Sequence, residues 1–309
     1  MVDPSNTPLA EIPRRDLMIA GAGVAALALG FGGRALAQTG SASPPPAPPT
    51  PGIVEVERRG LVLLIGINRP QAENRIDAAV IIGLGKAYYQ LEHDDGLRVG
   101  VLHGVGSDFC AGLDVPAFSA AQAAGILPPR DPDFINPLGL RPPLRTKPIV
   151  VAVQGSTKYV GHELLLSGDI RVAASDSVFG QAEVTRGVFP AGGGTIRFPR
   201  EAGWGNAMRY ILTGDEWGAE EAHRLGLVQE VTPVGKQLDR AIELANKIAA
   251  AAPLGVRAVL TSSHQALAAD EATALAALQV EFARILQSED AKEAQRAFKE
   301  TRAPVYRGQ

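Results

Sequence analysis

The stretch KPIVVAVQGSTKYVGHELLLSGDI, residues 147–170, combines a strand pattern with the start of a helix. Its first nine residues form an apolar run closed by glycine, which is typical of a buried strand, and a short helix is predicted to begin near Val160. Glu163 falls in the first turn of that helix, where an apolar run starts. Burial of a carboxylate is costly unless the group is paired or used. Glu163 is therefore either a functional acid or an ordinary acid that the helix dipole stabilises.

Strand and helix patterns alternate before this stretch, and helical patterns follow it. The sequence GIVEVERRGLVLLIGINRP (52–70) predicts two strands around a turn at Arg59 and Gly60. A helix is predicted in RIDAAVIIGLGKAYYQLEHDD (75–95) and a buried strand in LRVGVLHGVG (97–106). From Val234 onward the pattern is almost wholly helical. The fold class is therefore predicted to be α/β with a helical C-terminal part.

Composition excludes several kinds of partner and site. The 309 residues carry a net charge of −3 and contain no block of Lys and Arg, so no nucleic-acid partner is expected. The five His residues are scattered and Cys110 is the single cysteine. We therefore expect neither a metal site nor an intrachain disulfide.

The N-terminus has the parts of a secretory leader. Arg14 and Arg15 precede a Gly/Ala-rich apolar run (16–33), and ALAQ follows Arg34. These features are similar to a twin-arginine (Tat) signal peptide, residues 1–37, with export to the periplasm. An uncleaved anchor and a chance tail remain alternatives. If the leader is not used the protein stays cytoplasmic, and the membrane is contacted only through the leader before cleavage. A Pro-rich linker, residues 38–52, follows.

Two further segments have candidate chemistry. SDFCAGLDV (107–115) has small residues where a buried strand ends, which lets backbone N–H groups approach a ligand. FGQAEVTRGVFPAGGGTIRFPR (179–200) places Glu183 among apolar and small residues, and three glycines follow Pro190 and Ala191. This glycine run is no phosphate loop, because Lys-Ser or Lys-Thr does not follow it.

These segments, in this order, resemble the crotonase (enoyl-CoA hydratase/isomerase) superfamily. The likeness extends over about residues 53–307 and includes four motifs: NRPQAENRI (68–76), FCAGLDV (109–115), the central stretch 147–200, and ILTGDEWGAEEAHRLGLVQEV (211–231). The resemblance implies a crotonase-like ββα superhelix with two sheets, residues 53–233, and a C-terminal helical subdomain, residues 234–309. It also implies a homotrimer or a dimer of trimers, in which the helical tail covers the active site or a neighbouring subunit.

The resemblance also implies the site residues. Glu163 and Glu183 would be the catalytic acids that hold a water, and the backbone N–H groups of Ala111 and Val160 would form the oxyanion hole. No covalently bound cofactor is implied, because coenzyme A enters as part of the acyl-CoA substrate. The substrate-binding residues would be Gln71, Ala72, Asn74, Ala111, Gly112, Leu113, Asp114, Tyr159, Gly161, Pro190 and Ala191.

The chain departs from the family pattern beside the proposed oxyanion hole. Family members commonly have three glycines where this chain has Tyr159, Val160 and Gly161. Val160 keeps its N–H, but the two larger side chains must avoid the acyl group or narrow its channel. His162 is expected to pack or hydrogen-bond behind the site, since adjacent helical residues do not share a face. Cys110 is expected to be a buried small residue.

Three functions remain open from the sequence. The first is hydration of an enoyl-CoA by the two glutamates, with double-bond isomerisation as a further activity. The second is coenzyme-A-independent cleavage of a carbon–carbon bond in a β-diketone, which would suit an exported protein because coenzyme A is cytoplasmic. The third is an exported crotonase-fold binding protein without catalysis.

Overall fold

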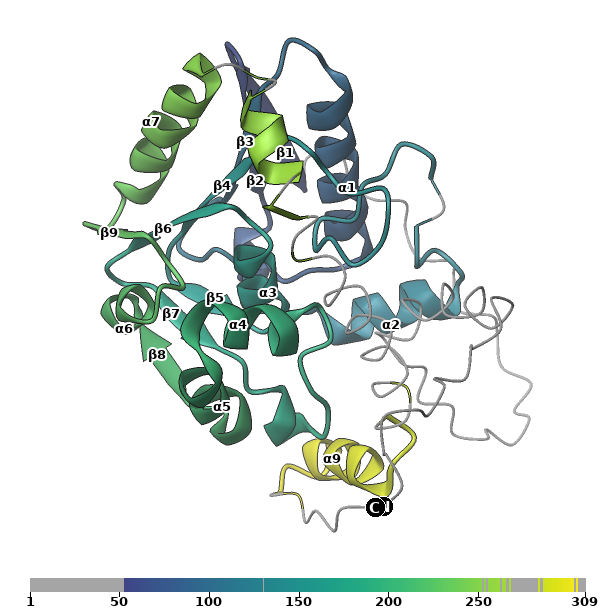
Figure 1. The fold of residues 1–309 in the computed structure, drawn as a ribbon. Helices are drawn as coiled ribbons and strands as arrows, with labels where there is room; N and C mark the ends of the chain where they lie inside the picture. Colours follow the sequence, from purple (N-terminus) through teal and green to yellow (C-terminus); the bar gives the residue numbers. More distant parts are fainter. Residues whose placement is uncertain are drawn as a thin grey trace, which may run out of the picture.

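A computed structural model gives the structure of the protein (Figure 1). It describes residues 53–129, 131–251, 253, 255–261, 263–264, 267, 283, 286–302 and 304. The predicted leader (1–37) and the predicted linker (38–52) lie outside these residues.

A six-stranded sheet forms the centre of the fold. Its strand order is β1-β2-β3-β4-β6-β9, with β1 antiparallel to β2 and the other neighbours parallel. The strands are β1 (Val54–Arg59), β2 (Val62–Ile67), β3 (Val99–Gly104), β4 (Ile149–Val153), β6 (Ile170–Ala174) and β9 (Glu230–Thr232). The predicted hairpin and the buried strands of 97–106 and 147–155 are therefore confirmed.

Helices on both faces explain why β2 and β4 are apolar throughout. Every residue of β2 is buried. Alternate side chains point to opposite faces of a sheet. Leu63 and Ile65 pack in the core that includes α1 (Ala78–His93), whereas Val62 and Leu64 pack with α7 (Gln237–Ala250). Figure 1 shows α1 and α7 on the two sides of this sheet.

A second, three-stranded sheet holds the segments that matter for function. It has the order β5-β7-β8, built from β5 (Ser156–Lys158), β7 (Val178–Gly180) and β8 (Glu216–Gly218). β5 also pairs with the residues before the AGLD motif, because Cys110 N donates to Ser156 O and Lys158 N donates to Cys110 O. The segment around Cys110, β5 and β7 therefore run side by side, with β5 in the middle.

The remaining elements are short. They are η3 (Pro70–Ala72), α2 (Val115–Ala123), α3 (Val160–Leu166), η4 (Glu183–Arg186), α4 (Gly194–Ala202), α5 (Trp204–Thr213), α6 (Ala219–Arg224) and α9 (Glu289–Lys299). No helix within the described ranges is long and apolar enough to cross a bilayer.

The Pro-rich segment, residues 126–148, packs on α1. Ile135 N donates to Gly85 O at 3.1 Å, and Phe134 lies so close to Gly85 that an added Cβ would be 2.1 Å from its ring. The Nζ atom of Lys86 is 3.0 Å from the carboxylate of Asp131. These contacts explain how a long loop is held against the core.

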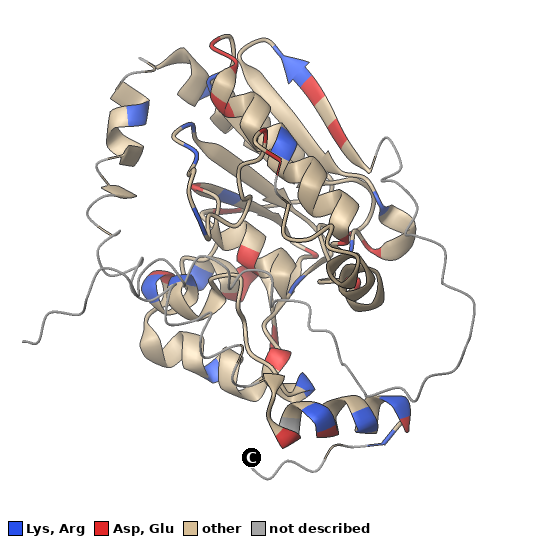
Figure 2. Cartoon of the chain, turned by 90° about the vertical axis from the view of Figure 1, so that its right-hand side faces the viewer, with Lys and Arg blue, Asp and Glu red and all other residues tan. Residues whose placement is uncertain are grey.

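The described parts of the C-terminal region are helical, as predicted. α7 packs against the large sheet through Ala241, Ala245 and Ala249. α9 contacts η4, and Figure 2 shows residues of both charge signs along it. The domain boundary after residue 233 stays a prediction, and α7 shares a core with the strands that precede it.

Candidate active site

The site forms where the three side-by-side segments separate. β5 ends at Lys158 and the chain turns at Tyr159 into α3, which begins at Val160. The neighbouring strand β7 continues instead into η4, which begins at Glu183. Glu163, in the first turn of α3, and Glu183 therefore come from adjacent segments of the small sheet.

Glu163 is buried, with 3% of its surface exposed. Its Oε1 atom accepts hydrogen bonds from Gly192 N at 2.7 Å and Gly194 N at 2.8 Å. Burial raises the pKa of Glu163 to about 7, although the bonds from Gly194 and Gly192 and the charge of Arg197 act in the opposite direction. The carboxyl group is thus fixed in place and titrates near neutrality.

The glycine run after Pro190 is required by this arrangement. A Cβ atom on Gly192 would lie 2.4 Å from Oε2 of Glu163, and one on Gly194 would lie 3.0 Å from its Oε1. Both distances are shorter than normal contacts, so only glycine lets the backbone approach the carboxylate. The sequence predicted close backbone packing here, and the structure shows that the packing partner is Glu163.

Glu183 is the second acid of the site. Its Oε2 atom is buried and has no hydrogen-bond partner among the described residues. Burial and the charge of Glu163 raise the pKa of Glu183 to about 8, and Arg186 acts in the opposite direction. Because the charge of Glu163 raises the pKa of Glu183, the two carboxyl groups interact, and their apparent pKa values belong to the pair.

The backbone donors differ from the expectation at one position. Val160 is the first residue of α3, and its N–H has no acceptor in the described part of the chain. The N–H of Ala111, however, donates to Glu73 O at 3.0 Å, so it is not free for a ligand. The prediction that Ala111 supplies the second oxyanion donor is therefore wrong in this structure.

Leu113 was predicted only as a substrate-binding residue, and its free backbone N–H is the donor that sequence reasoning did not assign. Ile76 N donates to Gly112 O at 2.8 Å, and Asp114 N donates to Ile76 O at 2.9 Å. Bonds of a parallel bridge alternate along the chain, so the N–H of Leu113 points away from Ile76. No residue in the described ranges accepts from it. This alternation was visible only once the pairing partner was known.

Two predicted substrate-binding residues hold the loops together instead. Asn74 is completely buried, and its amide donates to Val105 O and Asp108 O while its side-chain oxygen accepts from Arg69 N. It has no surface left for a substrate, which corrects the prediction. Asp114 is the N-cap of α2 and also pairs with Arg69 at 2.7 Å.

The other predicted substrate-binding residues lie around the acids or near the AGLD turn. Gly161 faces Cys110, since an added Cβ would be 2.4 Å from Cys110 O. Pro190 and Ala191 are buried beside the glycine run. Gln71 and Ala72 belong to η3, and Asn74 follows Ala72 by two residues. Their contacts with a ligand stay predictions.

Tyr159 has a backbone conformation that is unusual for a residue with a side chain. Its φ is 55° and its ψ is −125°. Positive φ of this kind costs about 1–3 kcal/mol for a non-glycine residue. The structure thus explains why family members commonly have glycine here, and it shows that this chain keeps a strained tyrosine beside the acids.

His162 and Cys110 are buried behind the site. The His162 ring is completely buried among Phe179, Phe198 and Trp217, and neither of its nitrogens has a hydrogen-bond partner in the part of the chain described. Of the two roles expected for it, only packing is seen. Burial raises the pKa of Cys110 to about 12, which keeps the thiol protonated.

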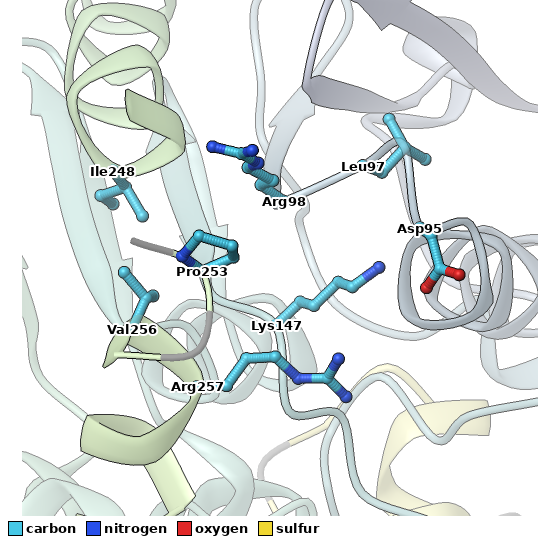
Figure 3. A pocket seen from close by; sticks show the side chains of 8 residues that line it. All are labelled: Asp95, Leu97, Arg98, Lys147, Ile248, Pro253, Val256 and Arg257. Atoms are coloured by element: carbon cyan, nitrogen blue, oxygen red, sulfur yellow. The ribbon is translucent and has the colours of Figure 1, made fainter. Parts of the chain in front are cut away.

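A cavity of about 200 Å³ lies elsewhere, at the opposite edge of the large sheet (Figure 3). Arg98 and Lys147 precede β3 and β4, whereas the two acids follow the other ends of these parallel strands. The lining residues are Asp95, Leu97, Arg98, Lys147, Ile248, Pro253, Val256 and Arg257.

The cations around this cavity have structural partners. Lys147 Nζ donates to Leu91 O and Asp94 O, both at 2.8 Å, at the end of α1. Arg98 donates to Ala249 O near the end of α7. Both side chains cap carbonyl groups at helix C-termini, where a positive charge is favourable. The cavity is therefore explained by helix capping and is not assigned a ligand.

Comparisons with known sequences agree with this geometry. A family model described as enoyl-CoA hydratase/isomerase matches residues 57–309. Enoyl-CoA hydratase EchA19 of Mycobacterium tuberculosis is 36% identical over 259 residues, which cover 81% of this chain and 95% of that relative. 2,3-Dehydroadipyl-CoA hydratase of Escherichia coli is 32% identical over 253 residues, covering 82% of this chain and 98% of that relative.

Solved structures share the fold. A probable enoyl-CoA hydratase/isomerase from Mycobacterium abscessus is 43% identical with a TM-score of 0.67, and the match covers 83% of this chain and 98% of that one. A carnitinyl-CoA hydratase from Mycobacterium avium is 33% identical with a TM-score of 0.73, and the match covers 84% of this chain and all of that one. The predicted crotonase-type α/β fold is thus confirmed, and the chain belongs to the enoyl-CoA hydratase/isomerase family of the crotonase superfamily.

Proposed function

We propose that the protein is a lyase that adds water across the double bond of α,β-unsaturated acyl-CoA thioesters. The observation that carries the proposal is the pairing of the buried carboxyl group of Glu163 with that of Glu183, whose Oε2 atom is buried and whose pKa the charge of Glu163 raises. The names of the relatives, which are hydratases of acyl-CoA compounds, support the same reaction class.

The two acids divide the proton transfers. In the active form the pair shares one proton. We assign this proton to Glu183, because the two N–H groups that donate to Glu163 favour its ionised form. Glu163, fixed by Gly192 and Gly194, accepts a proton from water while the water oxygen bonds to Cβ of the enoyl group. Glu183 donates its proton to Cα. The product is a 3-hydroxyacyl thioester, and the acids have exchanged protonation states.

Two backbone donors stabilise the negative charge that develops on the thioester oxygen. We assign them to the N–H groups of Val160 and Leu113, because both are without an acceptor among the residues described. A donor of this kind typically contributes about 10²–10³ in rate. Ala111 instead supports the turn through its bond to Glu73.

The test is the loss of the conjugated thioester absorbance when the purified protein is mixed with crotonyl-CoA. Glu163→Gln and Glu183→Gln each remove one proton-transfer group while keeping the side-chain shape, so each should lower kcat by about 10²–10⁴. Glu220→Gln, an exposed acid on α6, is the matched control and should leave kcat unchanged. Full activity in both active-site variants would contradict the proposal.

The other functions considered have less support. The named relatives are hydratases and a hydratase/isomerase, which disfavours coenzyme-A-independent cleavage of a β-diketone. A non-catalytic binding protein would not require two acids that titrate near neutrality in one buried site.

Assembly and compartment complete the proposal. We expect a homotrimer or a dimer of trimers, which light scattering of the active protein measures, and a monodisperse active monomer would contradict it. We also expect export through the twin-arginine-type leader. N-terminal sequencing of protein from its native host should then begin after Ala37, and a chain that retains residues 1–37 would contradict cleavage. Coenzyme A is cytoplasmic, so an exported enzyme needs a supply of thioester outside that compartment.

A further inference from the structure

Tyr159 is fixed in its strained backbone conformation by three hydrogen bonds. Its N–H donates to Gly180 O at 2.8 Å. Its carbonyl oxygen accepts from Gln181 Nε2 at 2.8 Å and from Glu163 N at 3.1 Å. Strain of this kind persists only where the surroundings enforce it, and it is concentrated at functional positions. The direction of the tyrosine side chain is therefore set by the same bonds that position the acid helix.

The Tyr159 ring lies between the two chain segments that flank the site. On one side it packs on Gly112, because an added Cβ there would be 2.9 Å from Cδ2 of the ring. On the other side the guanidinium carbon of Arg186 lies 4.3 Å from the ring centroid, which is a cation–π contact. Gly112 precedes the proposed donor Leu113, and Arg186 ends the short helix that begins with Glu183. The ring thus bridges the donor turn and the acid segment.

Besides the contact with the Tyr159 ring, Arg186 interacts with Glu183 through its charge. The side chain is exposed, and its guanidinium group is in salt-bridge distance of no carboxylate within the described ranges. Its ordered contact is the ring of Tyr159. Each side chain therefore restricts the motion of the other.

We propose that Tyr159, held by Arg186, is a specificity-determining residue that restricts the enzyme to thioesters with short acyl groups. The proposal rests on the hydratase function and deepens it. The ring lies against Gly112, next to the proposed donor Leu113, and against Arg186, in the segment of Glu183. On the proposed mechanism an acyl chain that leads from this donor to the acids passes beside the ring, which occupies space that a glycine would leave open. Bulk at this point excludes a long chain more than a short one.

The experiment measures kcat/KM for a four-carbon and a ten-carbon trans-2-enoyl-CoA and compares their ratio among variants. Tyr159→Ala and Tyr159→Gly remove the ring, and both should raise the ratio of long to short substrate by about tenfold or more. Tyr159→Phe keeps the ring and the cation–π contact, so its ratio should stay within about twofold of the unchanged chain. Arg186→Gln removes the cation that restricts the ring. The ratio of long to short substrate should then lie between that of the unchanged chain and that of Tyr159→Ala.

The outcomes separate this inference from the proposed function. If the unchanged chain hydrates neither substrate, the hydratase function fails. If it hydrates the short substrate but the ratio is the same in Tyr159→Ala and Tyr159→Gly, the ring does not select acyl length. An equal change of KM for the four-carbon and the ten-carbon substrate would also overturn the inference. The ring would then contact the thioester or coenzyme A part, which all the substrates share. If neither Tyr159 variant folds, Arg186→Gln decides by the same ratio, and an unchanged ratio overturns the inference.

Discussion

A methyl group on Gly192 would lie 2.4 Å from Oε2 of Glu163, so the position of this carboxylate depends on the absence of a side chain 29 residues further along. Gly192→Ala should displace Glu163 and weaken the bond from Gly192 N. We expect kcat for crotonyl-CoA to fall by about 10²-fold, because general-base catalysis requires accurate placement. Steady-state kinetics measures the change.

The control for this substitution is Gly205→Ala. Gly205 lies in α5, and a Cβ there would meet no atom within 4 Å. Alanine favours a helix over glycine by about 1 kcal/mol, so this variant should be as stable as the unchanged chain or more stable, with the same kcat. Equal activity in both variants would show that Glu163 does not need its glycine neighbours.

The acid pair should make the fold less stable as the pH rises. The pKa values of Glu163 and Glu183 are raised from 4.5 to about 7 and about 8. Between pH 4.5 and 8 the folded protein therefore holds protons that the unfolded chain has released, and the free energy of unfolding decreases with rising pH. Each unit of pKa shift in one group corresponds to about 1.4 kcal/mol.

Urea titrations at pH 5, 6, 7 and 8 measure this effect. In a variant that carries both Glu163→Gln and Glu183→Gln, the decrease over this range should be much smaller, since the groups responsible are gone. If the unchanged chain and the double variant lose the same stability between pH 5 and 8, the two carboxyl groups are not protonated in the folded state at neutrality.

His162 should have the opposite pH dependence. Burial, and to a lesser extent Arg171, lower its pKa from 6.5 to about 3. Below pH 6.5 the unfolded chain therefore binds a proton that the folded protein rejects, so this contribution destabilises the fold as the pH falls from 6.5 toward 3. His162→Leu removes the buried, unpartnered nitrogens and should raise the free energy of unfolding by about 1 kcal/mol at pH 8 and by more at pH 5.

The control is His223→Gln, a change at an exposed histidine on α6. It should change the free energy of unfolding by no more than about 0.5 kcal/mol at pH 8 or at pH 5. If His162→Leu gains the same stability at both pH values, the pKa of His162 is not lowered in the folded protein. A loss of stability would mean that its packing outweighs the cost of burying its nitrogens.

The sequence predicted the strands and helices that a short run of neighbouring residues is enough to identify. β2 and β4 are apolar throughout because both faces of the large sheet are covered, and such runs are recognisable without the structure. The two acids were found through their motifs. The donor at Ala111 was not predicted correctly, because its N–H is occupied by Glu73, a residue of a separate loop. Pairing between distant segments decides which N–H groups are free, and no local pattern contains it. Asn74 was misassigned for the same reason.

Replacing single backbone N–H groups by ester oxygens tests the corrected oxyanion hole. At Leu113 the corresponding α-hydroxy acid removes the free N–H, so kcat should fall by about 10²–10³, with a smaller loss of stability than at Ala111. At Ala111 the same change removes the bond to Glu73 O and should lower stability by about 1 kcal/mol. The pair is matched, because each ester also weakens one carbonyl acceptor, Gly112 O or Cys110 O. A larger loss of kcat at Ala111 than at Leu113 would restore the motif-based assignment, since the N–H of Ala111 would then have to leave Glu73 when the thioester binds.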